Sequence, residues 1–448
     1  MKNDRRTIFG WAMYDWANSA YMTTTAAALL PAYFARGVVP EGGYELFGRT
    51  YDGQTLWGYL VGSVSFLIFL LTPILGAIAD FSAAKKRFLA VFACGGAAFA
   101  TLLCLVGTGE VVLTMILFLL TQVGFVCGNV FYDGFLPEIS TPETIDRVSA
   151  KGYAFGYVGG GVQFALVLGL VAGHDYLGLS QTAAIRIGLA TAGLWWLGFT
   201  FLSLSRLTET AQGRPLPAEL RHLPQAVAYA KVGFSRTWST ARSLVHFKHL
   251  TLFLLAFMIY DDGVQTIIVM ASVYASDTLK LDTAAIQVTF LIIQFVAFPG
   301  ALLFGRLAGW VGARAAVLLA LGLWSAVACG AYFLSRGAAW QFLLLGAVVG
   351  LVMGGTQALS RSLYGSMIPE EASAEFFGFY SVFSKFSAIW GPLIFSAVSD
   401  LTGSARFSIL SLIAFFVAGA ILLALVDLDE ARASRHRWRL AGTSAGPK

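Results

Sequence analysis

Long apolar stretches recur along this chain, and they constrain its fold more than any other feature. Each stretch is long enough to cross the roughly 30 Å hydrocarbon core of a bilayer as a helix. Lipid offers no hydrogen-bond partners, and over stretches of this length a helix satisfies its own peptide groups. Only 12% of the 448 residues are charged, whereas soluble domains carry about a quarter. The sequence therefore predicts an all-α, polytopic membrane protein.

We expect twelve membrane spans in two groups of six. They lie near residues 8–35, 57–79, 88–107, 111–136, 153–174, 184–205, 250–274, 285–308, 314–335, 339–364, 376–399 and 406–427. The longest interruption holds three prolines and seven basic residues. The expected organisation is an N-terminal six-helix bundle (1–205), a cytoplasmic linker (206–249), a C-terminal six-helix bundle (250–430) and a cytoplasmic tail (431–448).

The basic residues of the loops predict the orientation. With a cytoplasmic N-terminus, 22 Lys and Arg residues fall on the cytoplasmic side and 6 on the other, while Arg361 and Lys385 lie inside spans. Cytoplasmic loops carry such an excess. Both termini are therefore expected in the cytoplasm, and the net charge of +5 is a topology signal rather than a nucleic-acid surface. The composition and short termini favour a bacterial inner membrane, or a vacuolar membrane in a eukaryote.

The linker also carries a helical pattern. Its apolar stripe consists of Val227, Phe234, Trp238, Ala241 and Val245, and the residues beside the stripe are Lys231, Ser235, Ser239 and Arg242. A basic amphipathic helix that lies in the bilayer interface has this pattern. We expect such a helix at the cytoplasmic surface.

Polar residues interrupt the first span. Tyr14, Asn18 and Tyr21 recur along one helical face, and Asp15 lies at its flank. A carboxylate at membrane depth is costly and usually faces a bundle interior or a water-filled cavity. Two interpretations follow: a buried polar patch that joins helices, or the wall of a substrate pathway.

The two groups of spans repeat one another, and the repeat favours the pathway. Asp15, Asn18 and Ser19 match Asp262, Gln265 and Thr266 in the seventh span, in the same pattern of acid, amide and hydroxyl. Three further matches follow in the same order: 76–85 with 305–314, 137–138 with 369–370, and 155–163 with 377–385. Parallel repeats of six spans are typical of major facilitator transporters. We therefore expect two pseudo-symmetric six-helix bundles.

Gly76-x-x-x-Asp80, followed by the basic cluster with Lys85 and Arg87, resembles the signature loop of the major facilitator superfamily. Gly76 allows close approach of a helix, and Asp80 can accept hydrogen bonds from a helix terminus or the cluster. The resemblance implies a gating role for Asp80, Lys85 and Arg87. Gly309 stands at the corresponding position of the second half, so we expect an asymmetric gate.

Six motifs carry a more specific resemblance. They are Tyr14–Tyr21, Phe131–Glu138, Gly152–Gly161, Asp262–Thr266, Gln357–Ser362 and Glu375–Tyr380. Together they resemble the vacuole-effluxer family, which contains autophagy-related vacuolar amino-acid exporters and bacterial relatives. The resemblance implies export of neutral or hydrophobic amino acids for the fungal members, and only transport for the bacterial ones.

In a major facilitator fold, helices 1, 4, 7 and 10 line the central cavity, with helices 5 and 11 nearby. The candidates for the substrate pathway are Tyr14, Asp15, Asn18, Tyr21, Asn129, Gln163, Asp262, Gln265, Gln357, Arg361 and Lys385. Carboxylates suit an ammonium group, and Arg361 or Lys385 suits a carboxylate, so this set favours a zwitterion. The alternative is that both cations pair internally with Asp133 or Asp262 and touch no substrate.

Coupling of transport to an ion would depend on the carboxylates, because all five histidines fall in loops, span ends or the tail. A proton relay would need Asp15, Asp133, Asp261 or Asp262; of these, Asp133 and Asp261 are the candidates for gating or coupling. Sodium binding through the same carboxylates is the alternative. Neither a phosphate-binding loop nor a hydrolase or metalloprotease motif occurs, so no enzyme, metal or cofactor is expected.

The sequence thus favours a monomeric secondary active transporter, with a small molecule, a coupling ion and the bilayer as its partners. We expect it to export a small zwitterionic or amphipathic solute, such as an amino acid, with proton coupling and alternating access. One alternative is an exporter of drug-like or lipid-like amphiphiles. Another is a sensor or scaffold that uses the same fold without transport.

Overall fold

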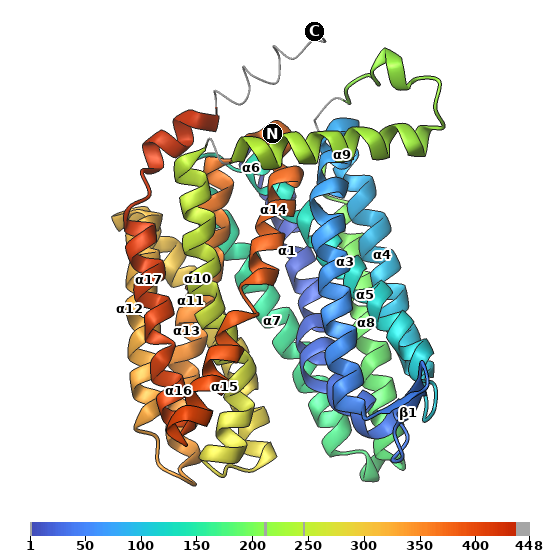
Figure 1. Ribbon diagram of the computed structural model, residues 1–448, viewed down its shortest axis with the longest axis vertical. Coiled ribbons are helices and arrows are strands. Elements are labelled where there is room, and N and C mark those ends of the chain that lie inside the picture. The colour runs from blue at the N-terminus through green and yellow to red at the C-terminus, as the bar shows by residue number, and fades with distance from the viewer. Residues whose placement is uncertain (1, 210–212, 245–246, 436–448) are drawn as a thin grey trace.

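The structure is a computed structural model that describes residues 2–209, 213–244 and 247–435, and its helices form two bundles that stand side by side (Figure 1). Within these residues, eleven helices are long and apolar enough to cross a membrane. A further helical run, 5–38, packs against the long helices of its own bundle. The polar residues around Asp15 make this run less apolar than the others. The chain therefore has the expected twelve-helix major facilitator fold.

The first bundle contains six long helical segments and one hairpin. Its elements are α1 (Arg5–Ala20), η1 (Tyr21–Leu29), α2 (Leu30–Tyr33), η2 (Phe34–Val38), β1 (Tyr44–Leu46), β2 (Arg49–Tyr51), α3 (Gly53–Ser82), α4 (Lys85–Leu102), η3 (Leu103–Leu105), α5 (Val111–Gly134), α6 (Leu136–Ile139), α7 (Ile145–Ala172), η4 (Asp175–Leu177) and α8 (Gln181–Leu204). The segments η1 and η2 are π-helical, so the first helix is wound more widely over its second half.

The second bundle follows the linker elements η5 (Ala218–Leu220) and α9 (Gln225–Leu244). Its elements are α10 (Lys248–Val273), η6 (Tyr274–Thr278), α11 (Thr283–Val311), α12 (Ala313–Tyr332), α13 (Ala339–Met367), η7 (Glu370–Ala372), α14 (Ser373–Phe386), α15 (Trp390–Thr402), α16 (Ala405–Ser411) and α17 (Ile413–Ala424). The predicted helix in the linker is thus present as α9, although Val245 of its stripe lies outside the described residues. The proposed boundaries of the four parts of the chain stay a prediction.

The two ends of the molecule differ. The loop after the first helix forms an antiparallel hairpin in which Glu45 pairs with Thr50. Phe47 and Gly48 turn the chain there with φ of 52° and 75°, the left-handed values that a tight hairpin turn needs. This hairpin lies at the end opposite α9, and the N-terminus lies near α9 (Figure 1). We call the two ends the hairpin end and the α9 end.

Side-chain caps begin several helices at the hairpin end. Asp52 accepts hydrogen bonds of 2.9 Å from the backbone amides of Gln54 and Thr55, and these amides have no partner inside α3. The hydrogen bonds from Thr55 hold the pKa of the Asp52 carboxyl below its usual value. Ser180 and Asp282 cap α8 and α11 in the same way. Each cap fixes where a span begins.

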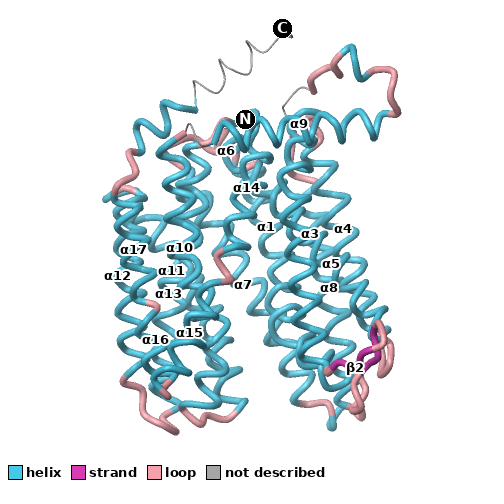
Figure 2. The backbone as a smooth tube through the Cα atoms, in the orientation of Figure 1, coloured by secondary structure: helices cyan, strands magenta, loops and turns pink. Residues whose placement is uncertain are grey.

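The eleventh span differs from the sequence prediction. We expected one helix over 376–399, but the structure has α14 and α15 with a break at residues 387–389 (Figure 2). The apolar pattern could not show this break, because residues on both sides of it are equally suited to lipid. Side chains of α10 hold the break, as described below.

Close packing joins α4 to α5 where two glycines meet. A Cβ atom on Gly124 would lie 2.5 Å from the Cα of Gly96 and 2.7 Å from the carbonyl oxygen of Phe92. Both neighbours are backbone atoms and cannot rotate away. Small residues allow membrane helices to approach in this way.

The replacement Gly124→Ala should therefore separate α4 from α5 and lower the stability by about 1–3 kcal/mol, the usual cost of overpacking. Gly95→Ala is the matched control, because a Cβ atom there has no neighbour within 4 Å. Thermal unfolding in detergent measures both. A Gly124→Ala protein as stable as Gly95→Ala would contradict the packing described.

Candidate functional site

A cavity of about 1040 Å³ lies between the two bundles. Its lining extends from Asp133 and Arg361, toward the α9 end, to Thr283 and Leu334 at the hairpin end. Ligand pockets for small molecules have volumes of about 300–1000 Å³. The cavity can hold a metabolite together with water.

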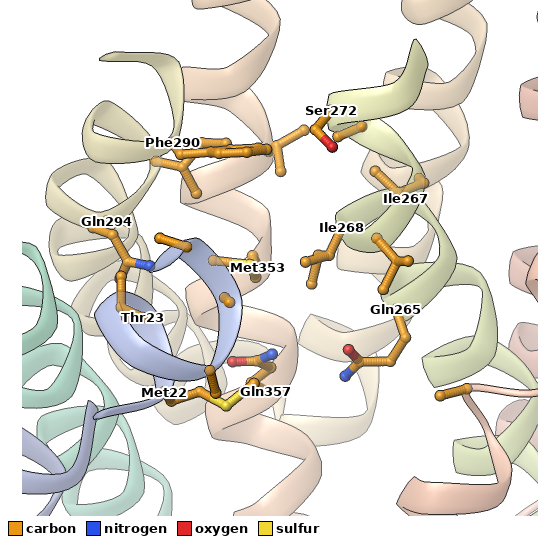
Figure 3. Close-up of a pocket in the computed structure, with 18 of the residues that line it drawn as sticks. Met22, Thr23, Gln265, Ile267, Ile268, Ser272, Phe290, Gln294, Met353 and Gln357 are labelled. Carbon is orange, nitrogen blue, oxygen red and sulfur yellow. The ribbon is translucent and has the colours of Figure 1, made fainter. Parts of the chain in front are cut away.

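Polar groups gather in the half of the cavity nearer the α9 end. Asn18 donates a hydrogen bond of 2.6 Å to Asn129, and Tyr157 donates one of 2.5 Å to Gln357 across the two bundles. In the close-up, Gln265 and Gln357 lie below Ile268, Phe290 and Met353 (Figure 3). The amides can therefore bind a polar solute from both sides.

The half nearer the hairpin end is mainly apolar. Ile267 and Ile268 come from α10, Phe290 from α11 and Met353 from α13. In the close-up Phe290 lies across the cavity from Ile267 and Ile268, with Met353 between them (Figure 3). The cavity thus has one polar and one apolar half.

Arg361 joins the second bundle to the first at the polar end of the cavity. Its Nη1 donates to Asp15 Oδ2 at 3.2 Å and to Asp133 Oδ1 at 3.0 Å. Its Nε and Nη2 donate to the side chain and the carbonyl oxygen of Ser149 at 3.0 and 2.9 Å. Arg361 as a whole is only 2% exposed, so these groups satisfy its guanidinium almost completely. For Arg361, this is the alternative stated in the sequence analysis, in which the cation pairs with carboxylates of the protein itself.

Aromatic rings enclose the same guanidinium. Its carbon lies 4.1 Å from the ring centre of Tyr153 and 4.8 Å from that of Trp11. Tyr132 donates a hydrogen bond of 2.7 Å to Asp15 Oδ2. Arg361 thus has two carboxylates and several π faces around it, and the two carboxylates share one cation. The cluster keeps one excess negative charge beside the cavity if both acids are ionised.

Lys385 is the second cation at the cavity, and it is placed differently. It lies on the last turn of α14 and lines the cavity. Its side-chain ammonium group forms no hydrogen bond or ion pair with any residue that the structure describes, although Asp261 acts on it electrostatically. An ammonium group without a direct partner can bind an anion from solution.

Asp261 and Asp262, halfway along α10, bind the two sides of the break in the eleventh span. Asp261 Oδ2 accepts hydrogen bonds from Ser387 at 2.8 Å and Ser384 at 3.4 Å, at the end of α14. Asp262 Oδ1 accepts one of 2.8 Å from the amide of Gly391, in the first turn of α15. A carboxylate at a helix N-terminus is favoured by the helix dipole. The paired acids therefore hold both sides of the break, while Pro392, which has no backbone N–H to donate, interrupts the helical hydrogen bonds across it.

Asp80 and Lys85, which the sequence predicted to act in gating, lie at the α9 end, where the bundles touch. Lys85 is buried and binds Asp80 at 3.1 Å, Glu138, and Ser373 of the second bundle at 2.9 Å. Asp80 also accepts a hydrogen bond of 2.8 Å from the amide of Glu375, in the first turn of α14. The acid of the signature loop thus caps a helix of the other bundle.

The same end is closed by backbone packing. A Cβ atom on Gly76 would lie 2.3 Å from the carbonyl oxygen of Ala374. Lys2 binds Glu370 at 2.5 Å between the two bundles. Arg87, which we grouped with the gating residues, is exposed.

The predicted residues thus separate into two groups. Eight line the cavity: Asp15, Asn18, Asn129, Asp133, Gln265, Gln357, Arg361 and Lys385. Four pathway candidates are not part of its lining: Tyr14, Tyr21, Gln163 and Asp262. Tyr21 lies one layer behind it and donates a hydrogen bond of 2.8 Å to Gln122, a lining residue, and Gln163 accepts one from Thr24. The ring of Tyr14 packs 4.9 Å from that of Tyr132.

Several residues of the site were missed from the sequence. Ser149 and Tyr153 contact Arg361, and the amides Gln122, Gln287 and Gln294 line the cavity. An amide inside a span was a usable signal for the last three. Tyr153 belongs to the recognised motif Gly152–Gly161 but had no assigned role, and Ser149 offered no signal, because serine is common in spans.

The comparisons with known proteins agree with this architecture. The family model described as "Vacuole effluxer Atg22 like" matches residues 3–436. A Bacillus subtilis protein named as an uncharacterized MFS-type transporter, YxiO, is 31% identical over 95% of this chain and 96% of its own length. Autophagy-related protein 22-1 of Neosartorya fischeri is 28% identical over 64% of this chain, and the match spans only 49% of that longer protein.

Solved structures share the fold at low identity. A bacterial homologue of the iron transporter ferroportin, in an outward-facing state, has a TM-score of 0.64 at 12% identity and covers 94% of this chain and 98% of its own. The proton:xylose symporter XylE has a TM-score of 0.67 at 13% identity and covers 96% and 97%. Taken with the matched family model, these findings show that the chain is a multi-pass membrane transporter of the major facilitator type and belongs to the Atg22-like vacuole effluxer family.

Proposed function

We propose that this protein exports a small amphipathic zwitterion, such as a neutral amino acid with an apolar side chain, across a bacterial inner membrane. The α9 end faces the cytoplasm in this proposal, because the basic loops lie there. The contacts that close the α9 end then shut the cavity toward the cytoplasm, as expected of the state that releases an exported solute. Alternating access would close the hairpin end and open the α9 end.

The unequal pairing of the two cavity cations carries the proposal. Arg361 is already bound by Asp15 and Asp133, whereas Lys385 has no direct partner among the described residues. Lys385 is therefore the candidate for the carboxylate of the solute. The excess negative charge shared by Asp15 and Asp133 is the candidate for its ammonium group.

The apolar half of the cavity supplies the third contact. Ile268, Phe290 and Met353 would take an apolar side chain, while the amides around Gln357 would take the polar head. A drug-like amphiphile would also use this apolar half. An uncharged or cationic amphiphile would gain nothing from the ammonium group of Lys385, and an anionic one would gain nothing from Asp15 and Asp133, so the zwitterion is favoured.

Proteoliposome uptake of radiolabelled leucine, with leucine's decarboxylated amine as competitor, tests the role of Lys385. The wild-type protein should prefer the amino acid, and Lys385→Met should lower its uptake at least about tenfold, because a charged hydrogen bond contributes about 1.5–3 kcal/mol. The variant should also lose the preference over the amine.

Lys280→Met is the matched control, since Lys280 is exposed at the hairpin end outside the cavity. Equal uptake by Lys385→Met and this control would contradict the proposed contact. No uptake by the wild-type protein under any gradient would refute the amino-acid proposal, and amphiphiles would be tested next.

We further propose that Asp261 carries the coupling proton. Its partners Ser384 and Ser387 can donate to a carboxylate or accept from a carboxylic acid, whereas Asp262 is bound by the N-terminus of α15, which favours a charge. The other ionisable groups that act on Asp261 are Lys385 and Tyr380 of α14, Tyr153 of α7 and Tyr260 of α10. None of them forms an ion pair with it within the described chain.

In Asp261→Asn, an imposed pH gradient should therefore no longer drive accumulation, while exchange of labelled for unlabelled solute continues. Asp262→Asn is the matched control, because asparagine still caps a helix and this variant should keep gradient-driven accumulation. Both fluxes are measured in the same proteoliposomes. Accumulation by Asp261→Asn at the wild-type level would place the coupling group elsewhere.

A further inference from the structure

Helix α9 lies at the depth where a membrane span ends. It packs against the last two turns of α3: a Cβ atom on Gly233 would lie 2.5 Å from Ile78 and 3.0 Å from the carbonyl oxygen of Ile74. The rings of Tyr229 and Phe81 meet at 6.2 Å. Because α3 is about 45 Å long and the hydrocarbon core about 30 Å thick, its final turns lie at the interface with the lipid headgroups.

The inner face of α9 holds a residue of the second bundle. Arg236 binds the carboxylate of Glu375 at 3.1 Å, and Thr240 donates a hydrogen bond to the same carboxylate. Glu375 is fully buried on α14, and its amide binds Asp80 of α3. The linker helix therefore ties α14 of one bundle to α3 of the other where the bundles close the α9 end.

The outer face of α9 is exposed and mixes basic with aromatic residues. Lys231, Phe234, Trp238 and Arg242 are spaced so that they share one helical face, opposite the buried Val232 and Thr240. Phe234 is 63% and Trp238 55% exposed, and the guanidinium of Arg242 lies 5.0 Å from the Trp238 ring centre. Aromatic side chains flanked by lysine and arginine are typical of helices that lie in an anionic membrane surface.

We propose that α9 is a membrane-bound latch: its outer face binds anionic phospholipid headgroups, while its inner face holds Glu375 against α3. The negative headgroups complement Lys231 and Arg242, and the aromatic rings lie at the depth of the interface. In this latch α9 leaves the headgroups when the α9 end opens, so the bilayer favours the conformation in which that end is closed. Opening of that end separates α14 from α3, so Glu375 must leave Arg236 or Asp80. This device does not depend on which solute is transported.

Pulsed electron paramagnetic resonance on the full-length protein tests the latch. Spin labels at Glu143→Cys and Val311→Cys report the distance between the bundles at the α9 end, after replacement of the four native cysteines. The protein is placed in liposomes of phosphatidylcholine alone or with phosphatidylglycerol. Each basic residue near an anionic leaflet contributes about fivefold in binding, so phosphatidylglycerol should lower the long-distance population about tenfold or more.

Two sets of variants test the outer and the inner face of α9 separately. Lys231→Gln with Arg242→Gln should abolish the difference between the lipids, whereas Arg49→Gln with Lys280→Gln, the same charge change at the hairpin end, should keep it. Arg236→Gln should raise the long-distance population in phosphatidylglycerol. Thr240→Val serves the same purpose if the Arg236 variant fails to fold in a thermal unfolding test.

Three results would overturn the proposal. One is an identical distance distribution of the wild-type protein in both lipids. Another is an undiminished lipid response in the Lys231 and Arg242 double variant. The third is an unchanged closed population when both Arg236→Gln and Thr240→Val fold normally. The liposomes contain no other protein, so a lipid response cannot come from a protein partner.

Discussion

The buried guanidinium of Arg361 is the interaction on which the arrangement of the two bundles depends. It belongs to the second bundle, yet Asp15, Asp133 and Ser149 of the first bundle satisfy it. A buried charge that loses its partners is strongly destabilising, because the protein interior does not replace the lost hydration. Separation of the bundles at this point is therefore costly unless water hydrates the separated charges.

Much of the fold follows from the sequence, because lipid imposes helices and the loop charges follow topology. The twelve spans, the helix α9 and the fold class were all predictable from apolar length, periodicity and the internal repeat. The break between α14 and α15 was missed, although Gly391-Pro392 directly after it is a helix-breaking sequence. The carboxylates of α10 that hold the break approach it only in three dimensions. The hairpin of residues 44–51 was also missed, because its strands are only three residues long.

The sequence predicts which residues belong to the candidate site, but it does not predict which of their side chains bind one another. A charged or amide side chain inside a span is conspicuous, so Asp15, Asn129 and Lys385 were identified from the sequence alone. Which cation was free could not be known, because Arg361 and Lys385 look equivalent until their neighbours are placed. Glu375 was part of a recognised motif without an assigned role, and only its contacts with Arg236 and Asp80 indicate one.

The break in the eleventh span also changes how movement at one side of the membrane is transmitted along that span to the other side. An unbroken helix moves as a rod, so displacement at one end of the membrane appears at the other. Here α14 is packed on α3 at the α9 end, whereas α15 packs on α16 beyond the break. The two segments can move one after the other instead of together. A transporter built in this way can close the hairpin end before it opens the α9 end, and so can trap its solute in an occluded state that admits no leak.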